Sequence, residues 1–147
     1  MTDGPRSGPP PRGASHELIE HTADVGIKAW GPSLADAFEH AVWGLVDVLG
    51  AHAERVDEKR VITLTATDRE ALLIDLLNEL IAMCDTEDAS LASVRVTTGG
   101  AHELRAEVGI ALGSTPDGLA VKAATYHAIS VAEAADGAAE VVVFLDV

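Results

Sequence analysis

The chain is 147 residues long, and 24 Asp and Glu against 10 Lys and Arg give it a formal net charge of −14, while 48% of its residues are hydrophobic. This length suits a single domain that buries about two thirds of the surface exposed by its unfolded chain. The apolar content excludes an intrinsically disordered protein, and the negative charge disfavours direct binding to phosphate backbones or anionic membranes. A basic protein partner or a cation is compatible with this charge.

The N-terminal segment and the cysteine content indicate the compartment. Residues 1–15 contain four prolines and three glycines and lack the apolar core of a signal peptide, so we expect a disordered tail before one folded domain at residues 16–147. Cys84 is the only cysteine, which excludes an internal disulfide, and no apolar run reaches the roughly 18 residues of a membrane span. We therefore expect a cytoplasmic protein in which Cys84 is a buried hydrophobe.

Extended and helical patterns alternate in the first part of the domain. Residues 16–31 resemble a strand or a hairpin, because apolar and polar positions alternate around a polar HTAD segment. Ser33, with Asp36 three residues later, resembles an N-cap. Apolar residues then recur at three- and four-residue steps over residues 34–49, and Gly50 is expected to end this helix.

The rest of the chain predicts one strand, a second helix and then strands only. Alternation at residues 61–66 indicates a half-buried strand, and Thr67 with Glu70 forms a capping-box signature before the apolar helical stripe of residues 72–81. Beyond this helix four strand-like segments are separated by glycine-containing turns: residues 94–97, 102–112, 119–131 and 141–147.

These elements predict an α+β fold. Connections this short favour antiparallel pairing of the strands. We therefore expect a two-layer domain, with one mostly antiparallel sheet and two amphipathic helices covering one of its faces.

Familiar catalytic signatures are absent, but three polar segments stand out. The sequence contains no phosphate-binding loop and no GxGxxG, HExxH, CxxC or GxSxG motif. The polar segments are residues 21–24, residues 122–127 and the terminal Asp146-Val147. Each combines polar side chains with an apolar strand pattern, so each is a candidate site.

Carboxylate oxygens suggest a metal site. Asp146 and the terminal carboxylate of Val147 lie close together, and Asp24 could join them if the last strand lies beside the first. Such hard oxygen donors suit Ca²⁺, Mg²⁺ or Mn²⁺. The plainer interpretations are that Asp24 is a turn or cap residue and that Asp146-Val147 is a solvated terminus.

The segment of residues 122–127 carries the other candidates. Lys122 could be a surface cation, half of a weak ion pair or an anion-binding charge. Tyr126 shares its parity, whereas Thr125 and His127 project to the opposite face, so a single cluster requires a bulge. His21 is more often a structural histidine than a ligand or base, because nothing beside it completes a dyad.

Four segments together resemble the archease family. They are HELIEHTADVGIKAWGPSLADAFEHAVWGL at residues 16–45, TDREALLIDLLNEL at residues 67–80, VKAATYH at residues 121–127, and the terminal Asp146-Val147. The resemblance covers residues 16–147, and the combination of HTAD, LLxxLLNE and KAxTYH is more specific than any one of these motifs.

The resemblance implies a protein cofactor that does not itself join RNA. Its partner would be an RtcB-type RNA ligase of tRNA splicing and RNA repair. The cofactor would promote GTP-dependent guanylylation of the active-site histidine of the ligase and support multiple turnover. It would contact RNA only through the ligase. The family's metal-binding carboxylates correspond to Asp24 and Asp146, with a terminal oxygen of Val147, and calcium is the expected ion, with magnesium or manganese as alternatives. Lys122 matches a lysine implicated in ligase activation, and His21 and His127 match motif residues with a supporting role.

Two other classes of function stay open at this stage. One is a chaperone-like interaction module, in which the acidic surface matters and the carboxylate pair does not. The other is a metal-dependent hydrolase with His21 as its candidate base. Client binding without the aspartates would favour the first, and turnover by the isolated chain would favour the second.

Overall fold

The computed structural model describes residues 15–21 and 24–147. Within them the chain forms two helices and two antiparallel sheets, with a four-stranded order β1-β2-β7-β6 and a three-stranded order β3-β5-β4. In chain order the elements are β1 (His16–His21), β2 (Asp24–Gly31), α1 (Leu34–Leu49), β3 (Glu58–Thr65), α2 (Arg69–Glu87), β4 (Ser90–Gly99), β5 (Glu103–Ala111), β6 (Ala123–Glu133) and β7 (Ala139–Asp146). Neither helix combines the length and the hydropathy that a membrane span requires, as far as the described residues go.

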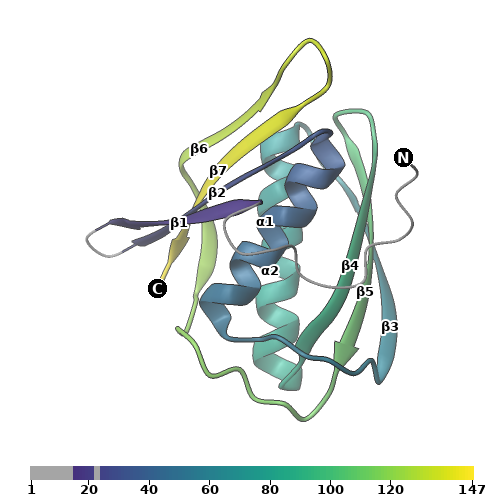
Figure 1. Cartoon of the computed structure of the whole chain (residues 1–147), viewed down its shortest axis with the longest axis vertical. Coiled ribbons are helices and arrows are strands. Elements are labelled where there is room, and N and C mark those ends of the chain that lie inside the picture. Colours follow the sequence, from purple (N-terminus) through teal and green to yellow (C-terminus); the bar gives the residue numbers. More distant parts are fainter. Residues whose placement is uncertain (1–14, 22–23) are drawn as a thin grey trace.

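The two helices lie between the two sheets, which gives three layers (Figure 1). Helix α1 contacts β2 and β7 of one sheet and β4 of the other, and α2 contacts β6 and β3. The α+β class, the antiparallel pairing and the two helices are confirmed. The prediction of one sheet in two layers was wrong, because alternation shows which face of a strand is buried but not which strands pair.

Helix α1 shows why a second sheet was needed. Its buried residues extend almost all round the helix and include Glu39 and His40 as well as the apolar stripe. A helix buried on every side lies inside a core instead of covering one face of it. The Glu39 side chain accepts a hydrogen bond of 3.0 Å from the backbone N–H of Val96 in β4, which satisfies a buried group at the edge of the second sheet.

The predicted helix ends are confirmed for α1 and shifted for α2. Ser33 Oγ accepts from the backbone N–H of Asp36 at 3.1 Å, and Gly50 ends α1 with a left-handed φ of 63°. Helix α2 begins after Asp68, whose Oδ1 accepts from the N–H of Ala71 at 2.8 Å. Asp68 and not Thr67 is therefore the N-cap; both residue types can cap, so the sequence did not separate them.

The segment between β5 and β6 packs on the end of α1. The N–H groups of Asp117, Gly118 and Leu119 donate to the last carbonyls of α1 and its cap at 3.3, 2.9 and 2.9 Å. These contacts satisfy acceptors that have no partner within the helix. The predicted strand at residues 119–131 begins only at Ala123, since the amide of Leu119 is bonded to the helix end instead of to a neighbouring strand.

Alternation along β2 and β7 fixes which side chains face the helices. Ile27, Ala29, Val141, Val143 and Leu145 are all fully buried in the core. Since side chains alternate in a strand, the neighbours of opposite parity face away from the helices. Asp24 and Asp146 therefore lie on the outer face of the four-stranded sheet.

Candidate functional site at the end of the four-stranded sheet

Three of the sequence motifs meet at one end of the four-stranded sheet. His21 pairs with Asp24, Asp24 pairs with Asp146, and Asp146 pairs with Ala123, so the residues form one row across all four strands. The row joins the HTAD block, the end of the chain and the start of the KAxTYH segment. The adjacency of β2 and β7 on which the metal hypothesis depended is present.

Asp24 and Asp146 are direct cross-strand neighbours, and both are half-buried. Facing residues of an antiparallel pair have Cα atoms roughly 4.5–5.5 Å apart, and their side chains project to the same face. Two carboxylates in this position repel each other unless a cation lies between them. The pairing of two carboxylates is therefore locally unfavourable.

The donor set fits a hard divalent cation. Both side chains offer oxygen only, which suits Ca²⁺ or Mg²⁺ and not a thiolate- or imidazole-preferring metal. No group of three or more His, Cys, Asp or Glu side chains among the described residues is arranged to hold a metal ion. The two aspartates thus need further oxygens, from the terminus at Val147, from water or from a partner.

Lys122 is held at the site through its backbone. Its N–H donates to the carbonyl oxygen of Asp146 at 2.8 Å, one residue before β6 begins. The side chain is exposed and forms no ion pair with any residue in the described ranges. Within the described ranges, the charge of Lys122 is thus left without an acidic partner although its backbone is bonded to Asp146.

Two further residues shape this end of the sheet and were not singled out from the sequence. Asn78 of α2 accepts a 2.8 Å hydrogen bond from the N–H of Ala124 through Oδ1, which ties the start of β6 to the helix. A Cβ on Gly26 would lie 2.7 Å from Cε2 of Phe144, its cross-strand partner, so the absence of a side chain lets this ring pack over Gly26, two residue pairs from the aspartates. The sequence signal that could have identified Asn78 is its position, because it is a polar residue on an otherwise wide apolar face of the helix.

The histidines of the two motifs are placed differently from the aspartates. His127 is exposed and lies in an irregular part of β6, between Thr125 and Ser130, where no residue pairs with β7. It is therefore outside the row of paired residues. The backbone of His21 pairs with Asp24, while its side chain, together with Thr22 and Ala23, lies outside the described part of the chain.

A second polar cluster joins the start of β1 to the end of α1. Asp47 accepts from Nε2 of His16 and from Nε2 of His52, each at 2.6 Å, and the ring of His52 stacks on Trp43 with centroids 5.9 Å apart. Ser15 is buried and its hydroxyl bonds Nδ1 of His16 at 2.9 Å. The two imidazoles bind opposite oxygens of one carboxylate, so the arrangement fastens three segments together.

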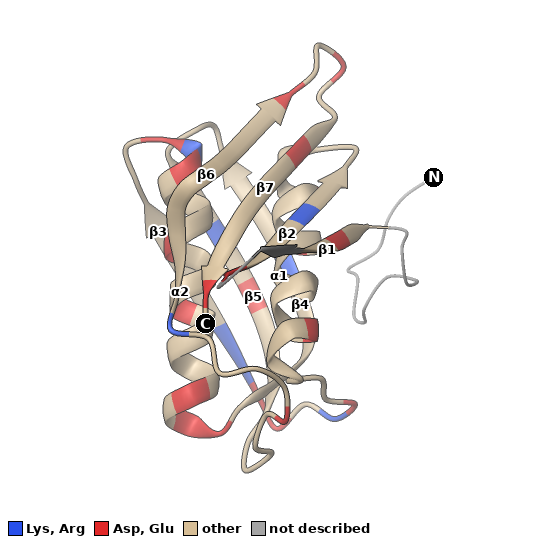
Figure 2. Ribbon diagram, turned by 90° about the vertical axis from the view of Figure 1, so that its left-hand side faces the viewer, with Lys and Arg blue, Asp and Glu red and all other residues tan. Residues whose placement is uncertain are grey.

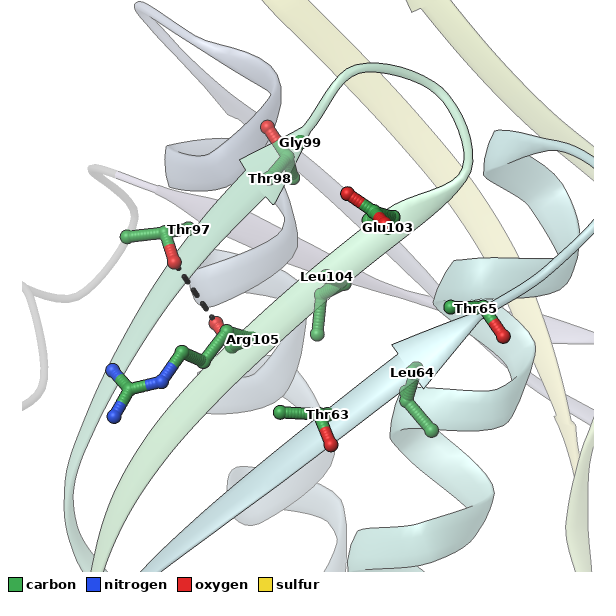
Figure 3. Close-up of a pocket in the computed structure, with 9 residues that line it drawn as sticks. All are labelled: Thr63, Leu64, Thr65, Thr97, Thr98, Gly99, Glu103, Leu104 and Arg105. Atoms are coloured by element: carbon green, nitrogen blue, oxygen red, sulfur yellow. Dashed lines mark hydrogen bonds between the residues drawn. The ribbon is translucent and has the colours of Figure 1, made fainter.

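Two other places lack the features of a reaction centre. A cavity of about 600 Å³ on the three-stranded sheet is lined by residues of β3, β4 and β5, and its hydroxyl groups and Arg105 do not converge on a nucleophile and base (Figure 3). Cys84 is buried, as expected, and burial raises the pKa of its thiol to about 11. A thiol in that state is not a nucleophile at neutral pH.

Comparison with known proteins decides the family. The model of the Archease protein family (MTH1598/TM1083) matches residues 16–147. The chain belongs to the archease family. The "Protein archease" of Methanosarcina acetivorans is 32% identical over 141 residues, covering 87% of this chain and 93% of that protein. The "Protein archease" of Thermococcus gammatolerans is 35% identical over 132 residues, covering 82% and 90%.

Solved structures show the same fold for this archease. The solution structure of protein 1598 from Methanobacterium thermoautotrophicum matches with a TM-score of 0.71 at 28% identity, covering 90% of this chain and 99% of that one. A Thermotoga maritima crystal structure, named as an archease and possible chaperone, matches with a TM-score of 0.62 at 23% identity over 89% and 96%. The family resemblance seen in the sequence is thereby confirmed.

Proposed function

We propose that this archease activates an RtcB-type RNA ligase by promoting metal- and GTP-dependent guanylylation of the ligase histidine. The observation that carries the proposal is the register of the four-stranded sheet. It sets Asp24 directly opposite Asp146 and bonds Lys122 to Asp146, so the family's charged positions converge at one end. Nothing in core packing requires these charges there.

Each residue has a distinct role in this proposal. Asp24 and Asp146 hold a divalent ion, calcium first and magnesium or manganese as alternatives, with Val147 as a further oxygen donor. When bound, such an ion would offset their repulsion and attract the phosphate oxygens of a nucleotide. Lys122 contacts a phosphate or an acidic group of the ligase, and His21 and His127 support the neighbouring backbone.

The charge of the protein supports a basic protein partner. A surface with net charge −14 repels RNA, so contact with RNA is indirect, through the ligase. The same charge steers a basic enzyme towards the archease and makes their association salt-dependent. We place this encounter in the cytoplasm.

The experiment is guanylylation of the cognate ligase with GTP over many turnovers, with wild type, Asp24→Asn, Asp146→Asn and Lys122→Ala. Glu79→Gln, which removes an exposed charge from α2, is the matched control. We expect stimulation by wild type and control and its loss in both Asp variants. Full stimulation by the Asp variants at saturation would support the ligase as partner and contradict the metal role of the two aspartates. No stimulation by wild type would contradict the ligase as partner.

A second candidate, a chaperone-like interaction module, rests on the acidic exposed residues along α2 (Figure 2). In that case client binding would depend on these charges and would survive loss of Asp24 and Asp146. Measuring aggregation of a basic client protein with the same set of variants separates the two functions.

A further inference from the structure

Tyr126 is exposed to an extent unusual for an aromatic side chain in this protein. Only 3% of the residues are aromatic and Tyr126 is the single tyrosine. The rings of Phe38 and Trp43 are buried, whereas Tyr126 keeps 57% of its surface exposed. A lone exposed aromatic ring on a small acidic domain is a candidate contact for a partner.

The backbone around Tyr126 is irregular and strained. Thr125 pairs with Phe144 and Ser130 with Val142. An advance of five residues along β6 therefore lies opposite an advance of two residues along β7, so three extra residues bulge from the sheet. Within this bulge Ala128 has a φ of 57°, a left-handed conformation that side chains rarely adopt. Strain of this kind persists only where the surroundings enforce it, and bulges often re-aim side chains at functional sites.

Contacts on both sides of the bulge hold it against α2. The N–H of Ala124 donates to Asn78 before the bulge, and Arg69 pairs with Glu133 after it. β6 is an edge strand that runs along α2 (Figure 2). The bulge is thus fixed at both ends, so Tyr126 is presented by an anchored segment.

The electrostatic surroundings of the ring are acidic. Helix α2 packs against β6, with Asp75 in its second turn and Asp68 as its N-cap. Partial burial raises the pKa of Tyr126, and the charges of Asp75 and Asp68 raise it further. The phenol is therefore protonated at neutral pH and lies within range of two carboxylates. An aromatic face beside negative charges attracts a cationic group and repels a phosphate.

We propose that Tyr126, Asp68 and Asp75 form a docking platform for an arginine or lysine side chain of a basic partner protein. The cation stacks on the ring while a carboxylate neutralises its charge, a geometry that suits the planar guanidinium of arginine best. Tyr126 follows Lys122 by four residues, and Lys122 directly precedes β6. Docking here would bring the partner to the end of the sheet that holds Asp24 and Asp146.

Where the partner is the ligase, this inference rests on the proposed function, and the test separates binding from activation. Tyr126→Ala should weaken the affinity for the ligase about 2- to 30-fold, the range that a cation–π contact provides, and leave stimulation at saturation unchanged. Tyr126→Phe keeps the ring and should retain affinity. Val61→Ala, which trims an apolar side chain that is 52% exposed on the other sheet, is the control.

The carboxylates are tested in the same binding assay. Asp75→Asn should lower the affinity and the salt dependence, whereas Asp85→Asn, about 15 Å further along α2, should do so less. Equal affinity of wild type and Tyr126→Ala for the ligase would overturn the platform as a ligase contact. Equal effects of Asp75→Asn and Asp85→Asn would overturn the role of the local carboxylates.

A ligase-independent measurement uses an arginine-rich peptide, with a lysine-rich and an acidic peptide of equal length beside it. Tyr126-dependent binding of the basic peptides supports the platform even if wild type fails to stimulate the ligase, which would refute only the proposed function. Binding that is the same for wild type and Tyr126→Ala overturns the platform. Single-stranded RNA bound by wild type and not by Tyr126→Ala would overturn it in favour of base stacking.

Discussion

Replacing Asp24 by Asn tests whether the facing aspartates are a functional pair or an ordinary turn. The substitution keeps the shape of the side chain and removes one of two charges on directly opposite residues. Like charges facing each other across a sheet cost about 0.2–1 kcal/mol, and Coulomb's law in water gives about 0.8 kcal/mol for charges roughly 5 Å apart. Since both residues are half-buried, we expect the upper part of this range.

Asp24→Asn should therefore be more stable than wild type in the presence of a chelator, by about 0.5–1 kcal/mol in urea unfolding. For a domain of this size the corresponding rise in Tm is about 2–5 °C. Addition of Ca²⁺ or Mg²⁺ should stabilise wild type in proportion to the logarithm of cation concentration above its Kd, and the variant much less. Glu79→Gln controls for the general relief of negative charge.

Two results would refute this reasoning. If Asp24→Asn unfolds more easily than wild type in chelator, the carboxylate accepts backbone hydrogen bonds as a turn or cap residue. The variant is then less stable because it has lost a hydrogen-bond acceptor. If wild type and variant gain equally from the cation, the ion binds elsewhere. Either result leaves membership of the family untouched and removes the metal from the mechanism.

The remaining predictions concern the rest of the described structure. Asp47→Ala removes the shared acceptor of two histidines, His16 among them, and should cost about 0.5–1.5 kcal/mol in urea unfolding because both hydrogen bonds are exposed; an unchanged midpoint would show that water replaces the carboxylate. The side-chain hydrogen bond from Arg55, with a backbone N–H as the second cause, lowers the pKa of Asp57, so its contribution is present above the unfolded value near 3.9 and is lost as pH falls through the folded pKa. The unfolding curves of wild type and Asp57→Asn should accordingly differ at neutral pH and converge in acid, and a constant difference would contradict the shift. Cys84 should react with a thiol reagent at pH 7–8 only after denaturation, and rapid labelling of the native protein would show that α2 opens locally.

Local signals predicted most elements of this fold because they act within a few residues. Ser33 and Gly50 mark the ends of α1 as expected, and the hydrophobic periods of α1, α2 and the strands are those seen in the structure. The errors concern what local signals do not encode. Partner choice divided the strands into two sheets, and the hydrogen bonds of residues 117–119 to the end of α1 delayed the start of β6.

The candidate site was only partly predictable for the same reason. Asp24 and Asp146 could be paired only on the condition that the last strand lay beside the first, since 121 residues separate them in the numbering. Asn78 was hidden because it carries no chemistry of its own and acts by holding the N–H of Ala124. The bulge in β6 had no sequence signal, because Ala128 stands where a positive φ normally calls for glycine.

Two energetically unfavourable features lie on the four-stranded sheet. Facing carboxylates at Asp24 and Asp146 weaken the pairing of β2 with β7, and the left-handed Ala128 strains β6. A sequence selected only for stability would carry an uncharged residue in place of one of the aspartates and a glycine in place of Ala128. Local conflicts of this kind are expected at functional positions, where activity and not stability selects the residue. Under the two proposals made above, the carboxylates would attract a metal ion and the strained bulge would present the ring of Tyr126 to a cationic side chain. Both departures from stability would then serve contacts with positive charge on the same sheet.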